Sequence, residues 1–269
     1  MKSIILSIAL FLTGVSLINA QDFEVAPISL HFTSNPGESQ TKTVTVKNHG
    51  NKEISIALTL KDYLVDKEGE RKIMPAESAK NSIAKWITVN PSYLNINPNK
   101  SQTVQLRYQP PNDDYSSKWG ILSVATAKEQ TSFSADKELS AGIGVYGRID
   151  VNLSHTPQSE MNKDQRIKIS NLREITSSED SVRKFSVHID NLGDILAQCE
   201  VYLIASNLQN LNEKKFPKEK FVAYPESSRE IELTIPKDKL SKGKYSLSAI
   251  LDYGSNESLE GTQTTIEVE

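Results

Sequence analysis

Residues Leu139-Ser-Ala-Gly-Ile-Gly-Val-Tyr-Gly-Arg-Ile-Asp-Val-Asn-Leu153 alternate between apolar and other side chains in a regular pattern. The odd positions are apolar except at Gly147, whereas the even positions carry serine, glycine, tyrosine, arginine, aspartate and asparagine. A period of two places alternate side chains on opposite faces of a strand, so the stretch predicts a β-strand with one apolar face. Fifteen residues would span roughly 50 Å, longer than most strands, and we expect the glycines to bend or bulge it.

The same alternation recurs in the residues before this stretch. It predicts short strands at Thr41–Lys47, Ile54–Leu60, Ile87–Val89, Tyr93–Ile96 and Thr103–Tyr108. Prolines and an Asn-His-Gly-Asn turn separate these strands, and one helical turn is expected near Ser78–Lys85, just before a tryptophan. Short strands at regular spacing, separated by turn residues of this kind, are typical of an all-β sandwich.

A second set of strands follows a polar segment near His155-Thr-Pro-Gln158. These strands are predicted at Arg166–Ser170, Arg183–Asp190, Glu200–Ala205, Glu230–Ile235, Tyr245–Tyr253 and Thr262–Val268. The stretch Asn212–Lys220, rich in lysine and glutamate, is interpreted as a solvated loop. We therefore expect an all-β chain with two immunoglobulin-like sandwiches in tandem, over residues 21–157 and 158–269.

The first 20 residues have the pattern of a cleaved signal peptide. Lys2 precedes an apolar run from Ile4 to Val15, and Ala20 supplies a small residue at the expected cleavage position. This run is shorter than the roughly 20 residues that cross a bilayer, so stable membrane insertion is not expected. We expect a periplasmic protein, with secretion or attachment at the cell surface as the alternative.

Charge and composition argue against several classes of function. A formal net charge of −3 does not indicate the concentrated basic face that binds nucleic acid. The single cysteine, Cys199, forms no disulfide within the chain and is interpreted as a buried strand residue. The four histidines show no metal-ligand spacing, and no catalytic or phosphate-binding motif is present, so neither an enzyme nor a cofactor is predicted.

Seven short motifs of the first half resemble, in order, the periplasmic pilus-assembly chaperones of the PapD-like family. They are Phe23-Glu-Val-Ala-Pro27, Leu30-His-Phe32, Pro36-Gly37, Thr43-Val-Thr-Val-Lys-Asn48, Trp86-Ile-Thr-Val-Asn-Pro91, Leu94-Asn-Ile-Asn-Pro98 and Ser101-Gln-Thr-Val-Gln-Leu-Arg107. The resemblance covers about Phe23–Leu153, and the second half resembles generic exported immunoglobulin-like modules. It implies that the first sandwich lends an edge strand to an exported subunit that lacks one.

The resemblance assigns candidate partner-binding residues to the last predicted strand of the first sandwich. Ile143, Val145 and Ile149 would be the apolar side chains that the strand lends, although a core-facing row produces the same pattern. The family holds the terminal carboxylate of its subunit with two basic residues. The early position corresponds to about Ser29, which is not basic, and the late one lies near Arg148 or Asp150, of which only Arg148 is suitable.

Three functions are compatible with these features. The leading hypothesis is an exported chaperone-like protein whose partner is another exported protein, such as a fimbrial or surface subunit. A structural or adhesive module of the cell envelope is the alternative. A carbohydrate-binding sandwich is the third, because Trp86 and Trp119 could stack on sugars, but Trp86 is set among apolar strand residues and is expected to pack in the core.

Overall fold

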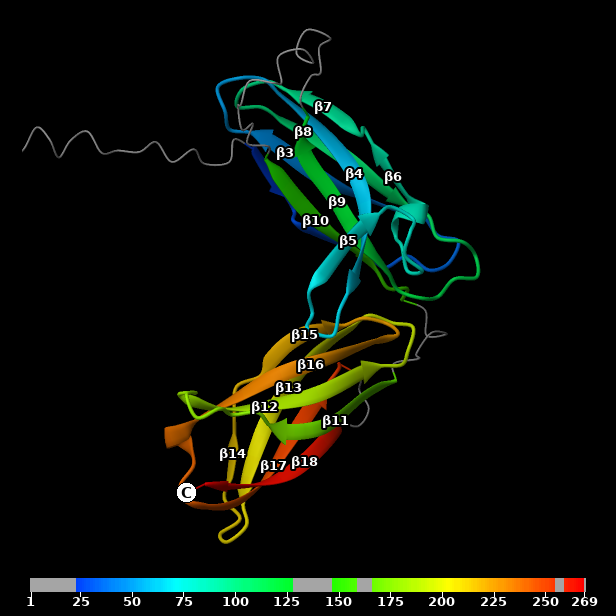
Figure 1. Cartoon of the computed structure of the whole chain (residues 1–269). Coiled ribbons are helices and arrows are strands. Elements are labelled where there is room, and N and C mark those ends of the chain that lie inside the picture. The colour runs from blue at the N-terminus through cyan, green and yellow to red at the C-terminus, as the bar shows by residue number, and fades with distance from the viewer. Residues whose placement is uncertain (1–22, 128–146, 159–165, 255–258, 269) are drawn as a thin grey trace, which may run out of the picture.

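The computed structural model describes residues 23–127, 147–158, 166–254 and 259–268 (Figure 1). The strands of the first half are β1 (Phe23–Ala26), β2 (Ser29–Phe32), β3 (Gln40–Asn48), β4 (Ile54–Val65), β5 (Arg71–Pro75), β6 (Ile87–Asn90), β7 (Tyr93–Ile96), β8 (Ser101–Tyr108), β9 (Lys118–Thr126) and β10 (Arg148–His155). A short 3-10 helix, η1 (Ala84–Trp86), precedes β6. The expected helical turn therefore forms, but it starts later than the sequence pattern indicated.

These strands form a sandwich of two sheets. One sheet has the order β1-β3-β8-β6, and the other has the order β2-β10-β9-β4-β5, with β7 also paired to β4. The alternating residues of β3 and β8 turn Val44, Val46, Val104 and Leu106 inward, and all four are fully buried. They meet the inward side chains of the second sheet in one continuous apolar core.

The first strand of the chain is divided between the two sheets. β1 pairs antiparallel with β3 in one sheet, while β2 pairs parallel with β10 in the other. The chain crosses between the sheets at Pro27, which lacks the N–H group that a continuous ladder would need. In the second sheet, Ser29 is aligned with Asn152 and Phe32 with His155, so β2 covers only the C-terminal half of β10.

The second half forms another sandwich. Its strands are β11 (Ile167–Glu174), β12 (Val182–Asn191), β13 (Ala197–Asn207), β14 (Glu213–Lys215), β15 (Glu219–Ala223), β16 (Ser227–Pro236), β17 (Gly243–Asp252) and β18 (Glu260–Val268), with a 3-10 helix, η2 (Lys237–Lys239), between β16 and β17. One sheet has the order β11-β12-β16, and the other has the order β14-β13-β17-β18, with β15 also paired to β13. A separate apolar core lies between them, and Cys199 is buried in it as expected.

The prediction of an all-β fold with two tandem sandwiches is confirmed. The prediction of a solvated loop over Asn212–Lys220 is wrong, because β14 and the start of β15 pair with β13 there. Phe216 lies between these two strands and is buried in the second core, which ties the segment to the sheet despite its many charges.

Two further points concern the N-terminus and the membrane. The predicted signal peptide, residues 1–20, lies outside the described residues. Within the described part of the chain, no helix combines the length and the apolar character that a membrane crossing requires.

Candidate functional site

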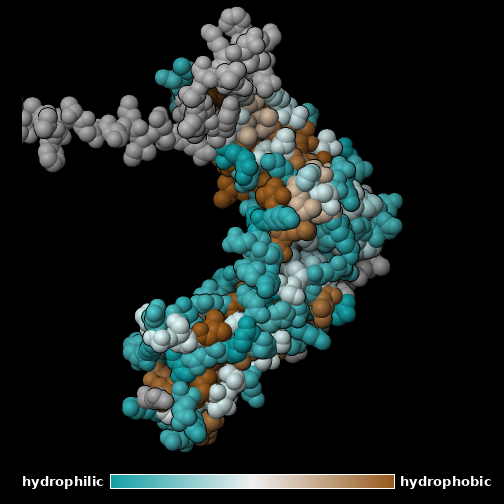
Figure 2. Space-filling view, in the orientation of Figure 1, coloured by the Kyte–Doolittle hydropathy of each residue, from teal (hydrophilic) through white to brown (hydrophobic). Residues whose placement is uncertain are grey.

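A cleft of about 480 Å³ lies where the two sandwiches meet. Figure 2 shows the molecule bent into a crescent, with its hollow side between the two halves. The cleft is lined by Ser29, His31, Tyr63, Arg71, Trp119, Asn152, Leu153, Ser154, Thr156, Leu196, Gln198, Val222 and Tyr224. Both sandwiches therefore contribute to its walls, and its shape depends on how they are held together.

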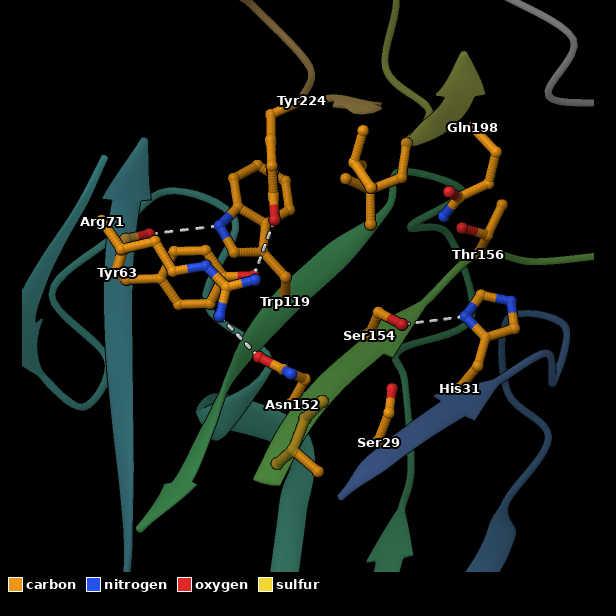
Figure 3. Close-up of a pocket in the computed structure, with 13 residues that line it drawn as sticks. Ser29, His31, Tyr63, Arg71, Trp119, Asn152, Ser154, Thr156, Gln198 and Tyr224 are labelled. Atoms are coloured by element: carbon orange, nitrogen blue, oxygen red, sulfur yellow. Dashed lines mark hydrogen bonds between the residues drawn. The ribbon is translucent and has the colours of Figure 1, made fainter. Parts of the chain in front are cut away.

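Three aromatic side chains join the sandwiches at one side of the cleft (Figure 3). Tyr63 of β4 and Trp119 of β9 pack edge-on against Tyr224, which follows β15, with ring centroids 5.9 and 5.1 Å apart. The Tyr63 and Tyr224 hydroxyl groups are hydrogen-bonded at 2.9 Å, and Nε1 of Trp119 donates to the Tyr63 carbonyl at 3.1 Å. Burial raises the pKa of Tyr63, so this hydroxyl group stays neutral.

Within the part of the chain that the structure describes, Arg71 is the one cationic residue of the cleft wall. It comes from β5, and its guanidinium lies over the Tyr63 ring at 4.6 Å from the centroid. Its Nη1 donates to Oδ1 of Asn152 at 2.6 Å (Figure 3). Among the described residues, none that lines the cleft is acidic, so the described wall combines one positive charge with neutral hydrogen-bonding groups. Such a site favours a carboxylate or another small anion.

The opposite wall is polar and neutral. His31 of β2 and Ser154 of β10 are hydrogen-bonded at 2.9 Å, and Ser29 lies beside Asn152 in the parallel ladder. Burial and the charge of Lys42 lower the pKa of His31, which keeps the imidazole uncharged near neutral pH. This wall can donate and accept hydrogen bonds without adding charge.

One edge of β10 is open before it reaches the cleft. The Asn152 N–H donates to the Ile28 carbonyl on the β2 side, whereas the Gly147 carbonyl accepts from Thr126 on the β9 side. Because alternate residues of a strand direct their backbone groups to the same side, the even residues before Asn152 also point to the β2 side. Among the described residues, no strand pairs with them there.

Arg148 and Asp150 carry these outward backbone groups. Their side chains form an ion pair, with 3.2 Å between Nη2 and Oδ2. Arg148 is exposed and does not line the cleft. In the ladder, Asn152 rather than Arg148 or Asp150 lies beside Ser29, so the late position that faces the cleft carries an amide.

The apolar row of β10 faces inward where the structure describes it. Val151 and Leu153 are buried in the first core, and Ile149 is partly buried against it. Ile143 and Val145 lie outside the described residues. The structure therefore places Arg148 at the open edge of β10 and turns Ile149 toward the first core. The partner-binding role of all four residues remains a prediction.

Sequence reasoning missed most of the cleft. Ser29 was placed correctly as a non-basic wall residue, but Arg71, Tyr63 and Tyr224 come from segments with no motif. The only sequence signal for Arg71 was its position in a basic stretch, Arg71-Lys72, directly after a Gly69 turn. That signal does not indicate which side chain reaches a cleft.

Metal and nucleophile chemistry has little support in the described residues. They contain no group of three or more histidine, cysteine or acidic side chains that could hold a metal ion. Burial raises the pKa of the Cys199 thiol to about 12, so a reactive thiolate is not formed at neutral pH.

No protein-family model and no curated protein sequence matches the chain. Among solved structures, it is similar to the class 5 fimbriae chaperone CfaA, with 14% identity, 90% of this chain and 98% of that chain covered, and a TM-score of 0.49. It is also similar to a chain of a chaperone–tip adhesin complex of CFA/I fimbriae, with 15% identity, 90% and 97% coverage and a TM-score of 0.49.

A third similar chain belongs to the CsuC–CsuE chaperone–tip subunit complex of Acinetobacter baumannii, with 12% identity, 78% and 89% coverage and a TM-score of 0.43. These likenesses are distant. They do not by themselves place the chain in a family.

Proposed function

We propose that this protein is an exported chaperone-like binding protein that assists the assembly of a fimbrial or surface protein. It holds its partner by strand addition along β10. One observation carries the proposal: over the described residues, the open edge of β10 leads directly into a cleft whose wall has a single cation and no acidic residue. An extended peptide on that edge would bring its end to the cleft.

Strand addition uses backbone groups that are already oriented. The outward N–H and C=O groups of Arg148 and Asp150 extend the ladder that Asn152 begins with Ile28. Ile143, Val145 and Ile149 are the apolar side chains proposed to fill the partner's groove. Arg148 is proposed to contact the added strand along its length.

Arg71 is proposed to bind the carboxylate at the end of that strand. Its planar guanidinium is suited to bidentate contact with a carboxylate, and the hydrogen bond to Asn152 fixes its orientation. Arg71 would thus replace the two basic residues that the resemblance leads one to expect on β2 and β10.

Arg71→Ala tests the carboxylate site. The probe is a short synthetic peptide of alternating valine and threonine, prepared with a free C-terminal carboxylate and as the C-terminal amide. The wild-type protein should bind the free acid roughly tenfold more tightly, and Arg71→Ala should abolish that preference. Arg148→Ala is the matched control and should weaken both peptides equally. Equal binding of the two peptides by the wild-type protein, measured by calorimetry, would refute the carboxylate site.

Substitutions in the apolar row test strand addition. Ile143→Asp or Val145→Asp should weaken binding of both peptides at least about tenfold, because a charge would replace an apolar side chain proposed to contact the added strand. The circular dichroism spectrum and thermal midpoint should stay unchanged. If either variant unfolds instead, the row belongs to the protein's own core.

A structural or adhesive envelope module is the second candidate. It is favoured by the inward orientation of Val151 and Leu153, which shows that the described half of the row serves the first core. This candidate predicts that neither peptide binds and that Arg71→Ala and Arg148→Ala have no effect.

A further inference from the structure

The β4–β5 hairpin extends from the first sandwich and contacts the second (Figure 1). Its turn is closed by a hydrogen bond from the Gly69 N–H to the Asp66 carbonyl at 3.0 Å. The Asp66 carboxylate also accepts from the Glu70 N–H at 2.8 Å. The tip is therefore a well-defined turn. Its contacts with the second sandwich can determine where the following strand, β5, lies.

The tip docks on β16 of the second sandwich. The Glu230 N–H donates to the Lys67 carbonyl at 2.9 Å, which adds a backbone hydrogen bond between the two halves. Gly69 lies against the guanidinium of Arg229, so closely that a Cβ atom on Gly69 would be 2.2 Å from Nη2. On its other side, Arg229 faces the Phe221 ring at 5.5 Å. A residue with a side chain at position 69 would displace the guanidinium from this stack.

Gly69 also needs its backbone freedom. Its φ of 90° lies in the left-handed region that glycine adopts without strain. Two separate properties thus select glycine here: the turn geometry, and the close approach of Arg229. The second property links the hairpin to the other sandwich.

Arg71 follows this tip by two residues. It is aligned with Val65 at the start of β5, and in the described residues β5 pairs only with β4. An edge strand held on one side has few restraints of its own. The hydrogen bond between the tip and Glu230 is therefore a main restraint on where Arg71 lies in the cleft.

We propose that docking of the hairpin tip on the second sandwich positions Arg71 for carboxylate binding, with Gly69 as the positioning residue because it lets the tip approach β16 past Arg229. This inference rests on the proposed function, because it assigns a role to the second sandwich at the same cleft. The second sandwich then acts on the partner's terminus through the position of Arg71, in addition to forming part of the cleft wall.

Gly69→Ala is the test, with the free-acid and amidated valine–threonine peptides as probes. Its Cβ atom should displace Arg229 and lift the tip, so the preference for the free acid should fall roughly tenfold while binding of the amide is unchanged. Gly254→Ala is the matched control. Gly254 also has a positive φ, of 74°, but among the described residues its Cβ atom would have no neighbour closer than 3.9 Å. Gly254→Ala should keep the full wild-type preference for the free-acid peptide.

Removal of the Arg229 side chain tests whether its clash with the new methyl group causes the loss of preference. In the double variant Gly69→Ala/Arg229→Ala, the new methyl group has room, and the Lys67–Glu230 hydrogen bond can form again. Most of the preference for the free acid should return, because only the backbone strain of alanine at a φ of 90° remains. A full preference in Gly69→Ala, or no recovery in the double variant, would overturn the inference. In either case the wild-type preference and its loss in Arg71→Ala would still support the proposed function, whereas a wild-type protein without preference would reject that function itself.

Discussion

Trp119→Ala is expected to lower the free energy of unfolding by about 3–5 kcal/mol, the range for truncating a large buried aromatic side chain. Trp119 is 7% exposed and contacts both sandwiches, because its ring packs against Tyr224 while its indole N–H donates to the Tyr63 carbonyl. Its removal leaves a cavity between the halves and a carbonyl group without its partner.

The form of the unfolding curve should change as well. We expect one urea transition for the wild-type protein and two for Trp119→Ala, since the halves lose most of their shared apolar contact. Trp86→Ala is the control, because Trp86 packs against the first core and Tyr108 and is absent from the shared cluster. Trp86→Ala should still unfold in one transition, with its midpoint at a lower urea concentration. One transition for Trp119→Ala, with a loss below about 1 kcal/mol, would contradict this account.

The first sandwich is expected to lose about 3 kcal/mol of stability as the pH falls from about 6.5 to about 4. Burial lowers the pKa of His155 to about 4, although the hydrogen bond between its Nε2 and the Ser34 carbonyl opposes the shift. The unfolded chain takes up the proton near pH 6.5, before the folded one does. Stability is therefore complete above that pH and declines below it.

The surroundings of His155 offer little compensation for a new charge. Tyr108 stacks on the imidazole at 4.5 Å, and Lys118 and His31 disfavour its protonation, while Asp114 favours it more weakly than burial opposes it. Because a carbonyl group only accepts, Nε2 carries the proton of the neutral ring. Nδ1 is buried without a hydrogen-bond partner in the structure.

His155→Gln should remove most of this pH dependence. The measurement is the midpoint of the protein's single urea transition at several pH values between about 4 and 7. His49→Gln is the control, because His49 is exposed and pairs only with Glu24 at the surface, so its pH profile should match that of the wild-type protein. Identical slopes for His155→Gln and the wild-type protein would disprove the role of His155.

Strands with one buried and one exposed face could be predicted from the sequence. Strands that are buried on both faces or exposed on both faces could not. β3 and β8 alternate between apolar and polar residues and were found at nearly the right bounds. β9 was missed because seven consecutive residues, Lys118–Val124, are buried, which removes the alternation. β5 was missed for the opposite reason, since all of its residues are exposed except the partly buried Met74.

The candidate site was predictable only where it lies on an alternating strand. Ser29 and the open edge of β10 follow from the resemblance and the period of two. Arg71 reaches the cleft because the β4–β5 hairpin bends toward the second sandwich, and that path is fixed by contacts of Gly69 and Lys67 with β16. Contacts between distant segments leave no periodic trace in the sequence, so the cation of the cleft could not be assigned in advance.

The parallel pairing of β2 with β10 sets an order for the formation of the first sandwich. Leu30 and Phe32 are near the beginning of the chain, yet their ladder partners are Leu153 and His155, more than one hundred residues later. In a chain synthesised from its N-terminus, these apolar side chains lack their ladder partners until β10 has been made. Closure of the sandwich is thus a late step that joins segments far apart in the sequence. A nascent chain that stops before His155 should remain accessible to proteases and to chaperones that bind unfolded chains.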